Sequence, residues 1–424
     1  MSGAISGFAP LRGVRVLDLG KVLAGPTCTQ LLADLGADVI KVEPTEVGDD
    51  TRGWPPFAGS GCDGAVFLSV NRNKRSLSVD LKTREGRDIV GRLLDTSDVL
   101  IESYRKGTIE RLGFGYAEVR ARRPGIIYAS ISGFGRTGPD AKLPGYDVMV
   151  QAASGIMAIT GEKGGGPVRS PFSPLDQTTG LWAAFGILAA LRERDRTGEG
   201  RFIEASLFDT ALAFMGYNIQ TYWMTGKPPG KAGSGHESLC PYQAFRAADD
   251  DLLLAVGSDK LWRQFCAAAG LDAYAEHPDY CRNADRVRNF DATVALVGAR
   301  LREKTVAEWS AILTAAGVPH APIAPLATVL DSPQVAARGI VQPYEHPRYG
   351  PLAAISIPLR TDGLDRTVRR PPPVLGQHTR EVLLEAGCSE QQIAGWAERK
   401  VIRCDPPASG ELDVAGTAGM DEAR

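Results

Sequence analysis

The first 140 residues alternate short apolar runs of β-forming residues with stretches of helical periodicity. This alternation is typical of βαβ units and predicts an α/β fold with a mostly parallel sheet. Because the connections after the strands are rich in glycine, proline and charge, we expect a ligand to bind at the strand ends. The expected strands are residues 14–19, 37–42, 75–79, 99–102 and 126–131, and the expected helices are 26–35 and 85–94.

Residues 181–191 read LWAAFGILAAL, which is apolar almost all round and predicts a buried helix. Asp176 lies just before this run, where the chain turns into the helix. Two interpretations of Asp176 stay open: an N-cap that binds the first unpaired N–H groups, or a nucleophilic carboxylate. In the second case the positive helix end would keep the carboxylate ionised, and the helix amides could receive charge that develops during attack.

The pattern changes after residue 200. A strand is expected at 201–208 and a helix through Tyr217, and residues 226–235 are rich in Gly, Pro and Lys, which predicts a linker or mobile loop. A separate α+β unit follows, with a strand and three helices. Residues beyond 403 are small and polar, so we expect a disordered tail. The predicted domains are 1–225 (large, α/β), 226–335 (small, α+β), 336–403 and the tail 404–424.

The composition excludes several kinds of partner. The chain has 424 residues, enough for two domains or more, and 43% of them are hydrophobic. The formal charge of −2 gives no reason to expect nucleic acid or a membrane as a partner, and no apolar run is long enough to span a membrane. The N-terminus lacks the features of an export signal, so we expect a cytoplasmic protein. The seven cysteines lack CxxC spacing and there is no HExxH motif, so we expect reduced thiols and no metal site.

Basic residues cluster after the predicted strands. Together they suit a ligand with several phosphates, such as coenzyme A (CoA) or a nucleotide. The GxGxxG match at 133–138 does not predict a dinucleotide site, since Pro139 and Pro144 preclude the helix that would hold a pyrophosphate. His236 lies in a Gly-rich loop that could close over a site. The basic cluster is Lys74, Arg75, Lys82, Arg105, Lys106, Arg111, Arg136 and Lys142.

Several motifs occur in order along almost the whole chain, from about Leu11 to Ile402. They are Val16–Asp18 with Ala24–Pro26, Leu32–Glu43, Asn73–Ser76 with Asp80–Lys82, Gly133–Gly135 with Gly138 and Pro139, Asp176 with Gly180, Pro241–Phe245, and Leu375–Thr379. In this order they resemble the CaiB/BaiF family, the class III CoA transferases. The resemblance implies a large Rossmann-like domain built from both chain ends, so that residues 336–403 return to it. It also implies a smaller α+β domain and an interlocked homodimer.

The resemblance further implies that Asp176 is the catalytic nucleophile. In such enzymes the carboxylate attacks an acyl-CoA thioester to give an anhydride and free CoA thiolate. The thiolate returns to form an aspartyl-CoA thioester, and an acceptor carboxylate takes the CoA through a second anhydride. This chemistry needs no permanently bound cofactor and no metal, but water must be excluded because anhydrides hydrolyse. The implied CoA-binding residues are Leu23, Ala24, Val79, Lys82, Ser103, Tyr104, Arg105, Arg111, Lys142 and Gly145, and the candidate substrate loop is Gly235, His236 and Glu237.

The chain departs from the family pattern at three places. Leu23 stands where some members have a Gln that contacts the active site. Oxalate-specific members have a four-glycine loop where this chain has Gly233–His236, which argues against formate/oxalate exchange. The related 2-methylacyl-CoA racemases have a His where this chain has Tyr146, so racemisation lacks its acid/base partner and ranks second.

The expected reaction moves CoA from an acyl-CoA, preferably succinyl-CoA, to a small carboxylic or dicarboxylic acid. A third hypothesis is a non-enzymatic CoA or nucleotide binder. It rests on the basic cluster and treats Asp176 as a helix cap.

Overall fold

The computed structural model describes residues 7–59 and 63–405, which form two compact units. The larger unit takes in Met1–Val150, Phe172–Phe214 and Gly339–Arg424, so both ends of the chain contribute to it. The smaller unit takes in Gln151–Pro171 and Met215–Arg338. The predicted tail lies outside the described residues except for its first two. Among the described helices, none combines the length and the apolar character that crossing a membrane requires.

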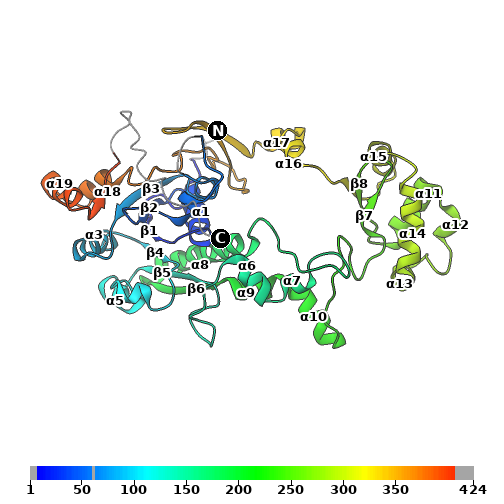
Figure 1. Ribbon diagram of the computed structural model, residues 1–424, viewed down its shortest axis with the longest axis horizontal. Coiled ribbons are helices and arrows are strands. Elements are labelled where there is room, and N and C mark those ends of the chain that lie inside the picture. The colour runs from blue at the N-terminus through cyan, green and yellow to red at the C-terminus, as the bar shows by residue number, and fades with distance from the viewer. Residues whose placement is uncertain (1–6, 60–62, 406–424) are drawn as a thin grey trace, which may run out of the picture. The chain divides into compact units, whose positions relative to one another are not determined.

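A seven-stranded sheet forms the centre of the larger unit (Figure 1). Its strand order is β12-β3-β2-β1-β4-β5-β6, in which β1 to β6 are parallel and β12 is an antiparallel edge strand. The expected mostly parallel sheet is confirmed. The order of β1 to β6 is that of the doubly wound α/β fold, which reverses between β1 and β4. The strands are β1 (Arg15–Leu19), β2 (Asp38–Glu43), β3 (Lys74–Val79), β4 (Val99–Glu102), β5 (Ile127–Ser132), β6 (Arg201–Ser206) and β12 (Ile402–Arg403).

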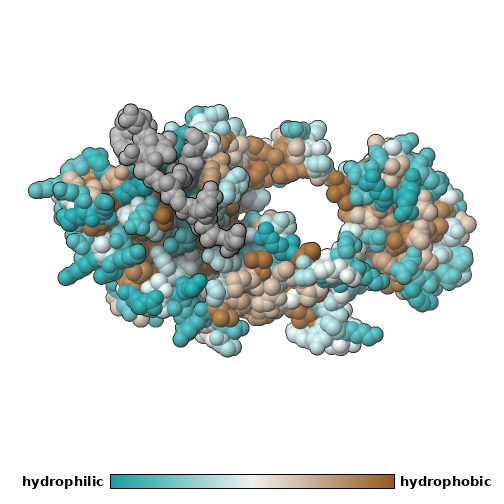
Figure 2. All heavy atoms as spheres, in the orientation of Figure 1, coloured by the Kyte–Doolittle hydropathy of each residue, from teal (hydrophilic) through white to brown (hydrophobic). Residues whose placement is uncertain are grey.

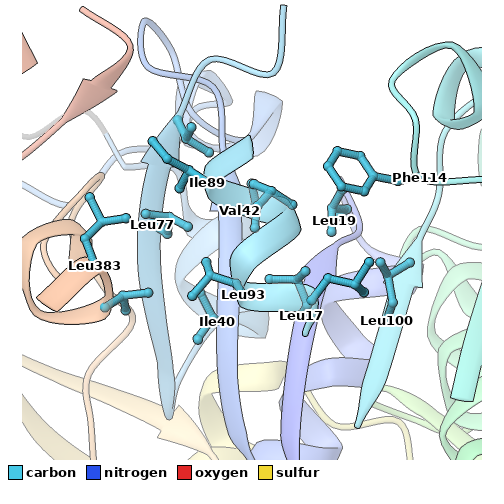
Figure 3. Packing of buried hydrophobic residues seen from close by; sticks show 14 of the residues in the cluster. Leu17, Leu19, Ile40, Val42, Leu77, Ile89, Leu93, Leu100, Phe114 and Leu383 are labelled. Carbon is cyan, nitrogen blue, oxygen red and sulfur yellow. The ribbon is translucent and has the colours of Figure 1, made fainter. Parts of the chain in front are cut away.

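Helices cover both faces of this sheet, so the central strands are buried almost throughout, including the charged side chains of Asp18 and Lys41. On one face, Leu17 and Ile40 of the strands pack against Leu93 of α3 and Leu383 of α18 (Figure 3). Helices α1 and α8 pack on the other face (Figure 1). The helices of this unit are α1 (Ala24–Asp34), α2 (Ala65–Val70), α3 (Arg84–Leu94), α4 (Thr108–Arg111), α5 (Tyr116–Arg122), α8 (Pro174–Thr197), α9 (Leu207–Phe214), α18 (Thr379–Glu385), α19 (Glu390–Glu398) and the 3-10 helix η1 (Asp50–Gly53), together with the start of α6 (Asp147–Ala153), whose residues from Gln151 on belong to the smaller unit.

Helix α8 is longer and less buried than the sequence pattern predicts. It includes the expected run at 181–191, but Leu181, Trp182 and Phe185 are 55%, 51% and 64% exposed. Within one copy of the chain, the helix is therefore not buried all round as expected. Ala183 and Ile187 face the core instead. An apolar sequence shows that a side chain can be buried, but it does not show which neighbour covers it.

Two other expected elements differ from the structure. The strand expected at 201–208 ends at Ser206, where α9 begins. The helix expected through Tyr217 is divided at Met215 into α9 and α10. A separate antiparallel pair in the larger unit consists of β10 (Val341–His346) and β11 (Gly350–Ile355).

The smaller unit has a core of its own. A three-stranded antiparallel sheet, β7-β8-β9, contributes Phe245 and Leu254, and the helices contribute Trp262, Val297 and Trp309. Its elements are α7 (Ile156–Ile159), α10 (Gly216–Thr225), β7 (Tyr242–Arg246), β8 (Asp251–Ala255), α11 (Asp259–Ala269), α12 (Asp272–Ala275), α13 (Asn283–Arg288), α14 (Phe290–Leu301), α15 (Val306–Ala315), β9 (His320–Pro322), α16 (Leu326–Leu330) and α17 (Pro333–Arg338).

Candidate active site

A cavity of about 320 Å³ lies at the carboxyl ends of β1, β4, β5 and β6. Lys21 follows β1, Ser103 follows β4, Gly133 follows β5 and Leu207 follows β6, and all four line the cavity. Open α/β sheets bind ligands at this edge, at the point where the strand order reverses. Asp176 lines the same cavity, so the structure places the predicted nucleophile where the topology favours a ligand.

Most of the residues assigned to CoA by the family resemblance line this cavity or a second one. The second cavity, of about 280 Å³, shares Lys21 and Tyr104 with the first. Leu23, Arg111 and Lys142 line neither cavity, although Lys142 lies between two lining residues. The predicted residues that line the first cavity are Ala24, Ser103, Tyr104, Arg105 and Gly145, and those that line the second are Val79, Lys82 and Tyr104.

The predicted basic cluster is only partly assembled. Lys74 and Arg75 begin β3 instead of following a strand, and both have buried side chains. Lys74 Nζ lies 3.4 Å from Asp18 Oδ2, and Arg75 Nη2 lies 2.5 Å from Asp38 Oδ2. These two cations therefore bind carboxylates of the fold. The members of the cluster that line the two cavities are Lys82, Arg105 and Lys106.

Asp176 lies in the first turn of α8 but is not its N-cap. Ser173 holds the N-cap position, with a φ of 50° and no side-chain hydrogen bond to the helix. Instead, Oδ2 of Asp147 accepts the N–H groups of Leu175 at 2.8 Å and of Asp176 at 3.1 Å. The N-cap interpretation of Asp176 is therefore wrong, because a carboxylate from the start of α6 binds these donors.

The surroundings of Asp176 raise its pKa to about 7. Burial is the larger cause and the charge of Asp147 is the second. The expectation that the helix end keeps Asp176 ionised is therefore wrong, because burial and the charge of Asp147 raise the pKa of this carboxyl instead. Near neutral pH both protonation states are populated. The ionised form is more basic than an ordinary aspartate and hence a stronger nucleophile.

Close backbone contacts position both carboxylates. Gly180 of α8 packs against α1, and a Cβ at Gly180 would lie 2.5 Å from the carbonyl oxygen of Ala24. A Cβ at Gly133 would collide with the Cα of Gly145. The first contact brings the start of α8 to the start of α1. The second holds the segment before α6, and with it Asp147, against the end of β5.

A buried ion pair holds the loop between β1 and α1. Lys41 Nζ lies 2.8 Å from Asp49 Oδ2, and both side chains are 1% exposed. The same Asp49 oxygen accepts the N–H of Val22 at 3.2 Å. Val22 has a φ of 67°, a strained conformation for a β-branched residue, and it lines the cavity. The ion pair therefore fixes one wall of the candidate site.

The predicted substrate loop lies in the smaller unit. The ring of His236 lies between those of Tyr217 and Tyr242, at centroid distances of 6.3 and 5.8 Å. Gly235 and Glu237 bind backbone groups of the same loop. These contacts give the loop a defined conformation within its own unit.

Sequence reasoning missed Asp147 and several cavity residues. The sequence analysis compared Tyr146 with the His that racemases have at this position, and it predicted no role for the neighbouring Asp147. An aspartate at the start of an apolar helical run is a capping signal, but nothing in the sequence indicates that it caps another helix. Lys21, Val22 and Asp50 also line the cavity without a preceding motif that identifies them.

A doubly wound sheet with a half-buried carboxylate of raised pKa at its topological reversal is typical of an enzyme site. Comparison with known proteins is more specific. Residues 11–379 match the model of CoA-transferase family III, and the chain belongs to this family. It is accordingly an enzyme that transfers CoA.

Individual relatives cover almost the whole chain. Human succinyl-CoA:glutarate CoA-transferase is 36% identical over 99% of this chain and 92% of its own length. Succinate–glutarate CoA-transferase of Agrobacterium fabrum is 38% identical over 89% of this chain and 95% of its own. The crystal structure of a CaiB/BaiF family protein from Brucella suis is similar with a TM-score of 0.80 and 36% identity, over 89% of this chain and 99% of that one.

Proposed function

We propose that this protein transfers CoA from succinyl-CoA or a similar acyl-CoA to a small dicarboxylic acid, with Asp176 as the covalent nucleophile. The observation that carries this proposal is the position of Asp176: a half-buried carboxylate with a pKa of about 7 that lines a cavity at the topological reversal of the sheet. Two relatives have names that specify succinate or succinyl-CoA and glutarate, which supports the choice of substrates.

The proposed reaction proceeds through two anhydrides. A carboxylate oxygen of Asp176 attacks the thioester carbonyl, the C–S bond breaks, and CoA leaves as the thiolate. The thiolate attacks the aspartyl carbonyl of the anhydride, which releases the first acid and leaves an aspartyl-CoA thioester. The acceptor carboxylate then attacks this thioester and again releases the thiolate. The thiolate finally attacks the acceptor's carbonyl, which forms the new acyl-CoA and frees Asp176.

The two cavities support a binding mode for an elongated ligand. Because they share Lys21 and Tyr104, one CoA molecule can occupy both, with its thioester beside Asp176. We assign the second cavity, lined by Val79 and Lys82, to the nucleotide end. Lys21 and Arg105 supply positive charge for phosphates or for the second carboxylate of the acceptor. The start of α1, at Ala24, supplies N–H groups for the oxyanion.

The oligomer implied by the family is also part of the proposal. Leu181, Trp182 and Phe185 of α8 are more than half exposed, and Leu212 and Phe214 of α9 are exposed as well. Figure 2 shows apolar residues over α9 on the visible face. Large apolar side chains that gather on adjacent helices are typical of protein interfaces. We assign this surface to a second copy of the chain.

Sedimentation velocity at micromolar concentration tests the dimer. The wild type should sediment as a dimer, and Phe185→Lys should dissociate it. Val47→Lys, at another exposed apolar residue, should not. A monomeric wild type would overturn the assignment.

Covalent trapping tests the nucleophile. Incubation with succinyl-CoA followed by borohydride or hydroxylamine should modify Asp176, as read by peptide mass spectrometry. Asp176→Ala should lose transfer to glutarate by about a thousandfold or more while it still binds CoA. Asp291→Ala, which removes an exposed acid from the first turn of α14 in the smaller unit, should keep both CoA transfer and CoA binding. Wild-type turnover by Asp176→Ala would refute the proposal, and α-proton exchange without CoA transfer would favour a racemase.

A further inference from the structure

Asp147 is a buried carboxylate that the reaction scheme does not use. It is 5% exposed, and its Oδ2 accepts N–H groups from Leu175 and Asp176 at 2.8 and 3.1 Å. Ser173, at the N-cap position, makes no side-chain bond to the helix. Asp147 therefore satisfies two backbone donors of the first turn, and the positive end of a 24-residue helix stabilises its charge.

We propose that Asp147 is a positioning residue for Asp176, an inference that rests on the proposed role of Asp176 as nucleophile. Its two hydrogen bonds fix the backbone of the turn that carries the reacting carboxylate. Its negative charge sets the electrostatic environment in which that carboxylate reacts.

The charge of Asp147 has a consequence for the chemistry. Repulsion between the two carboxylates makes Asp176 more basic, which increases the nucleophilicity of its ionised form. When Asp176 attacks, its negative charge moves to the carbonyl oxygen of the substrate and then to the sulfur of CoA. The repulsion is therefore relieved as the anhydride forms, and it returns when Asp176 is set free.

Other charged groups face the same cavity from several elements. Lys21 lies on the loop after β1, Asp50 on η1, and Arg105 and Lys106 on the segment after β4. Asp147 differs from these groups because it is bonded to the backbone of Asp176 itself. The charge of Asp147 is also the second-largest cause of the raised pKa of Asp176, and burial is the largest.

Three substitutions separate the hydrogen bonds from the charge. Asp147→Asn keeps an oxygen that accepts the N–H groups but removes the charge. The pKa of Asp176 should then fall by about one unit, and the acid limb of kcat/KM should move to lower pH by the same amount. Asp147→Glu keeps the charge, so the acid limb of its pH profile of kcat/KM should lie near that of the wild type. Asp147→Ala removes both functions, so kcat at the pH optimum should fall about tenfold or more below that of Asp147→Asn.

Two independent readouts measure these effects. Infrared titration follows the carboxyl band of Asp176, identified by its absence in Asp176→Asn, and does not depend on turnover. The pH profile of kcat/KM for CoA transfer from succinyl-CoA to glutarate follows the reaction. Asp291→Asn, an exposed carboxylate in the first turn of α14, is the matched control and should change neither. Thermal unfolding verifies that each variant is folded.

The outcomes distinguish this inference from the proposed function. If Asp176 is trapped by succinyl-CoA but its pKa and the acid limb are unchanged in Asp147→Asn, the role of Asp147 is overturned and the nucleophile stands. If Asp176→Ala turns over normally, the proposed function fails, and the positioning role fails with it even where the infrared titration shifts. A shift of both readouts in Asp147→Asn, restored by Asp147→Glu, supports the inference.

Discussion

Replacing Gly180 by alanine should displace the first turn of α8 from the start of α1. A Cβ at this position would lie 2.5 Å from Ala24 O, 3.0 Å from Thr27 Cβ and 3.1 Å from Cys28 N. Comfortable contact between non-bonded heavy atoms is about 3.5 Å, so the two helices must separate by about 1 Å. Backbone atoms form two of these contacts, and no side-chain rotation relieves them.

The expected loss of activity exceeds the expected loss of stability. Overpacking costs about 1–3 kcal/mol, and the better helix propensity of alanine offsets about 1 kcal/mol, which leaves about 0–2 kcal/mol. In contrast, a displacement of about 1 Å at a reacting group lowers the rate about 100-fold. Because Ala24 and Asp176 line the same cavity on either side of this contact, kcat/KM should fall by about that factor.

The assay compares Gly180→Ala with Gly186→Ala in the same helix. A Cβ at Gly186 would meet Ile203 Cγ2 at 3.1 Å, and this side chain can shift. Gly186→Ala should therefore keep its kcat/KM for CoA transfer from succinyl-CoA to glutarate and unfold at the wild-type temperature or above it. A folded Gly180→Ala protein with wild-type kcat/KM would show that the contact between the helices does not position Asp176.

Two further predictions concern buried charges. The folded pKa of Asp176, about 7, exceeds the ordinary value of 3.8. Between these values the folded state binds more protons than the unfolded state, so this group lowers the free energy of unfolding as pH rises. The Tm of Asp176→Asn relative to the wild type should therefore increase from pH 4 to pH 8, and a constant difference would contradict the assignment. Lys41→Met should lower the free energy of unfolding by about 3–5 kcal/mol, because it leaves Asp49 buried without its cation. Arg84→Met removes an exposed partner of Asp88 and should leave urea denaturation almost unchanged, so equal losses would refute this reasoning.

The strands of the sheet were predictable because each one is indicated by residues that are adjacent in the sequence. Runs such as 14–19 and 126–131 are short and mostly apolar, and each is followed by turn residues, so the sequence itself marks the strands. The exposed face of α8 was not predictable in the same way. Leu181 and Phe185 are as apolar as Ile187, and only the packing of the chain determines which of them faces the core.

The candidate site was only partly predictable, because its chemistry depends on contacts between distant residues. The motif around Asp176 and Gly180 indicated a carboxylate at a helix start, and this position is confirmed. The sequence predicted that Asp176 stays ionised, whereas partial burial and the charge of Asp147, neither of which is visible in the local sequence, raise its pKa. Asp147 is 29 residues away in sequence, and the contact between Gly133 and Gly145 that helps to hold it cannot be inferred from either glycine alone.

The features that make the site reactive also oppose folding. Asp176 is desolvated beside another carboxylate, and Val22 holds a backbone conformation that its side chain disfavours. Both residues line one cavity, whereas the ion pair of Lys41 and Asp49 lies behind it and is fully buried. A strained conformation persists only where the surrounding structure holds it in place. Here the Lys41–Asp49 ion pair and the close contacts of Gly133 and Gly180 hold the residues that line the cavity. Substitutions that stabilise the protein at this cavity should therefore weaken catalysis, whereas stabilising substitutions elsewhere in the larger unit should not.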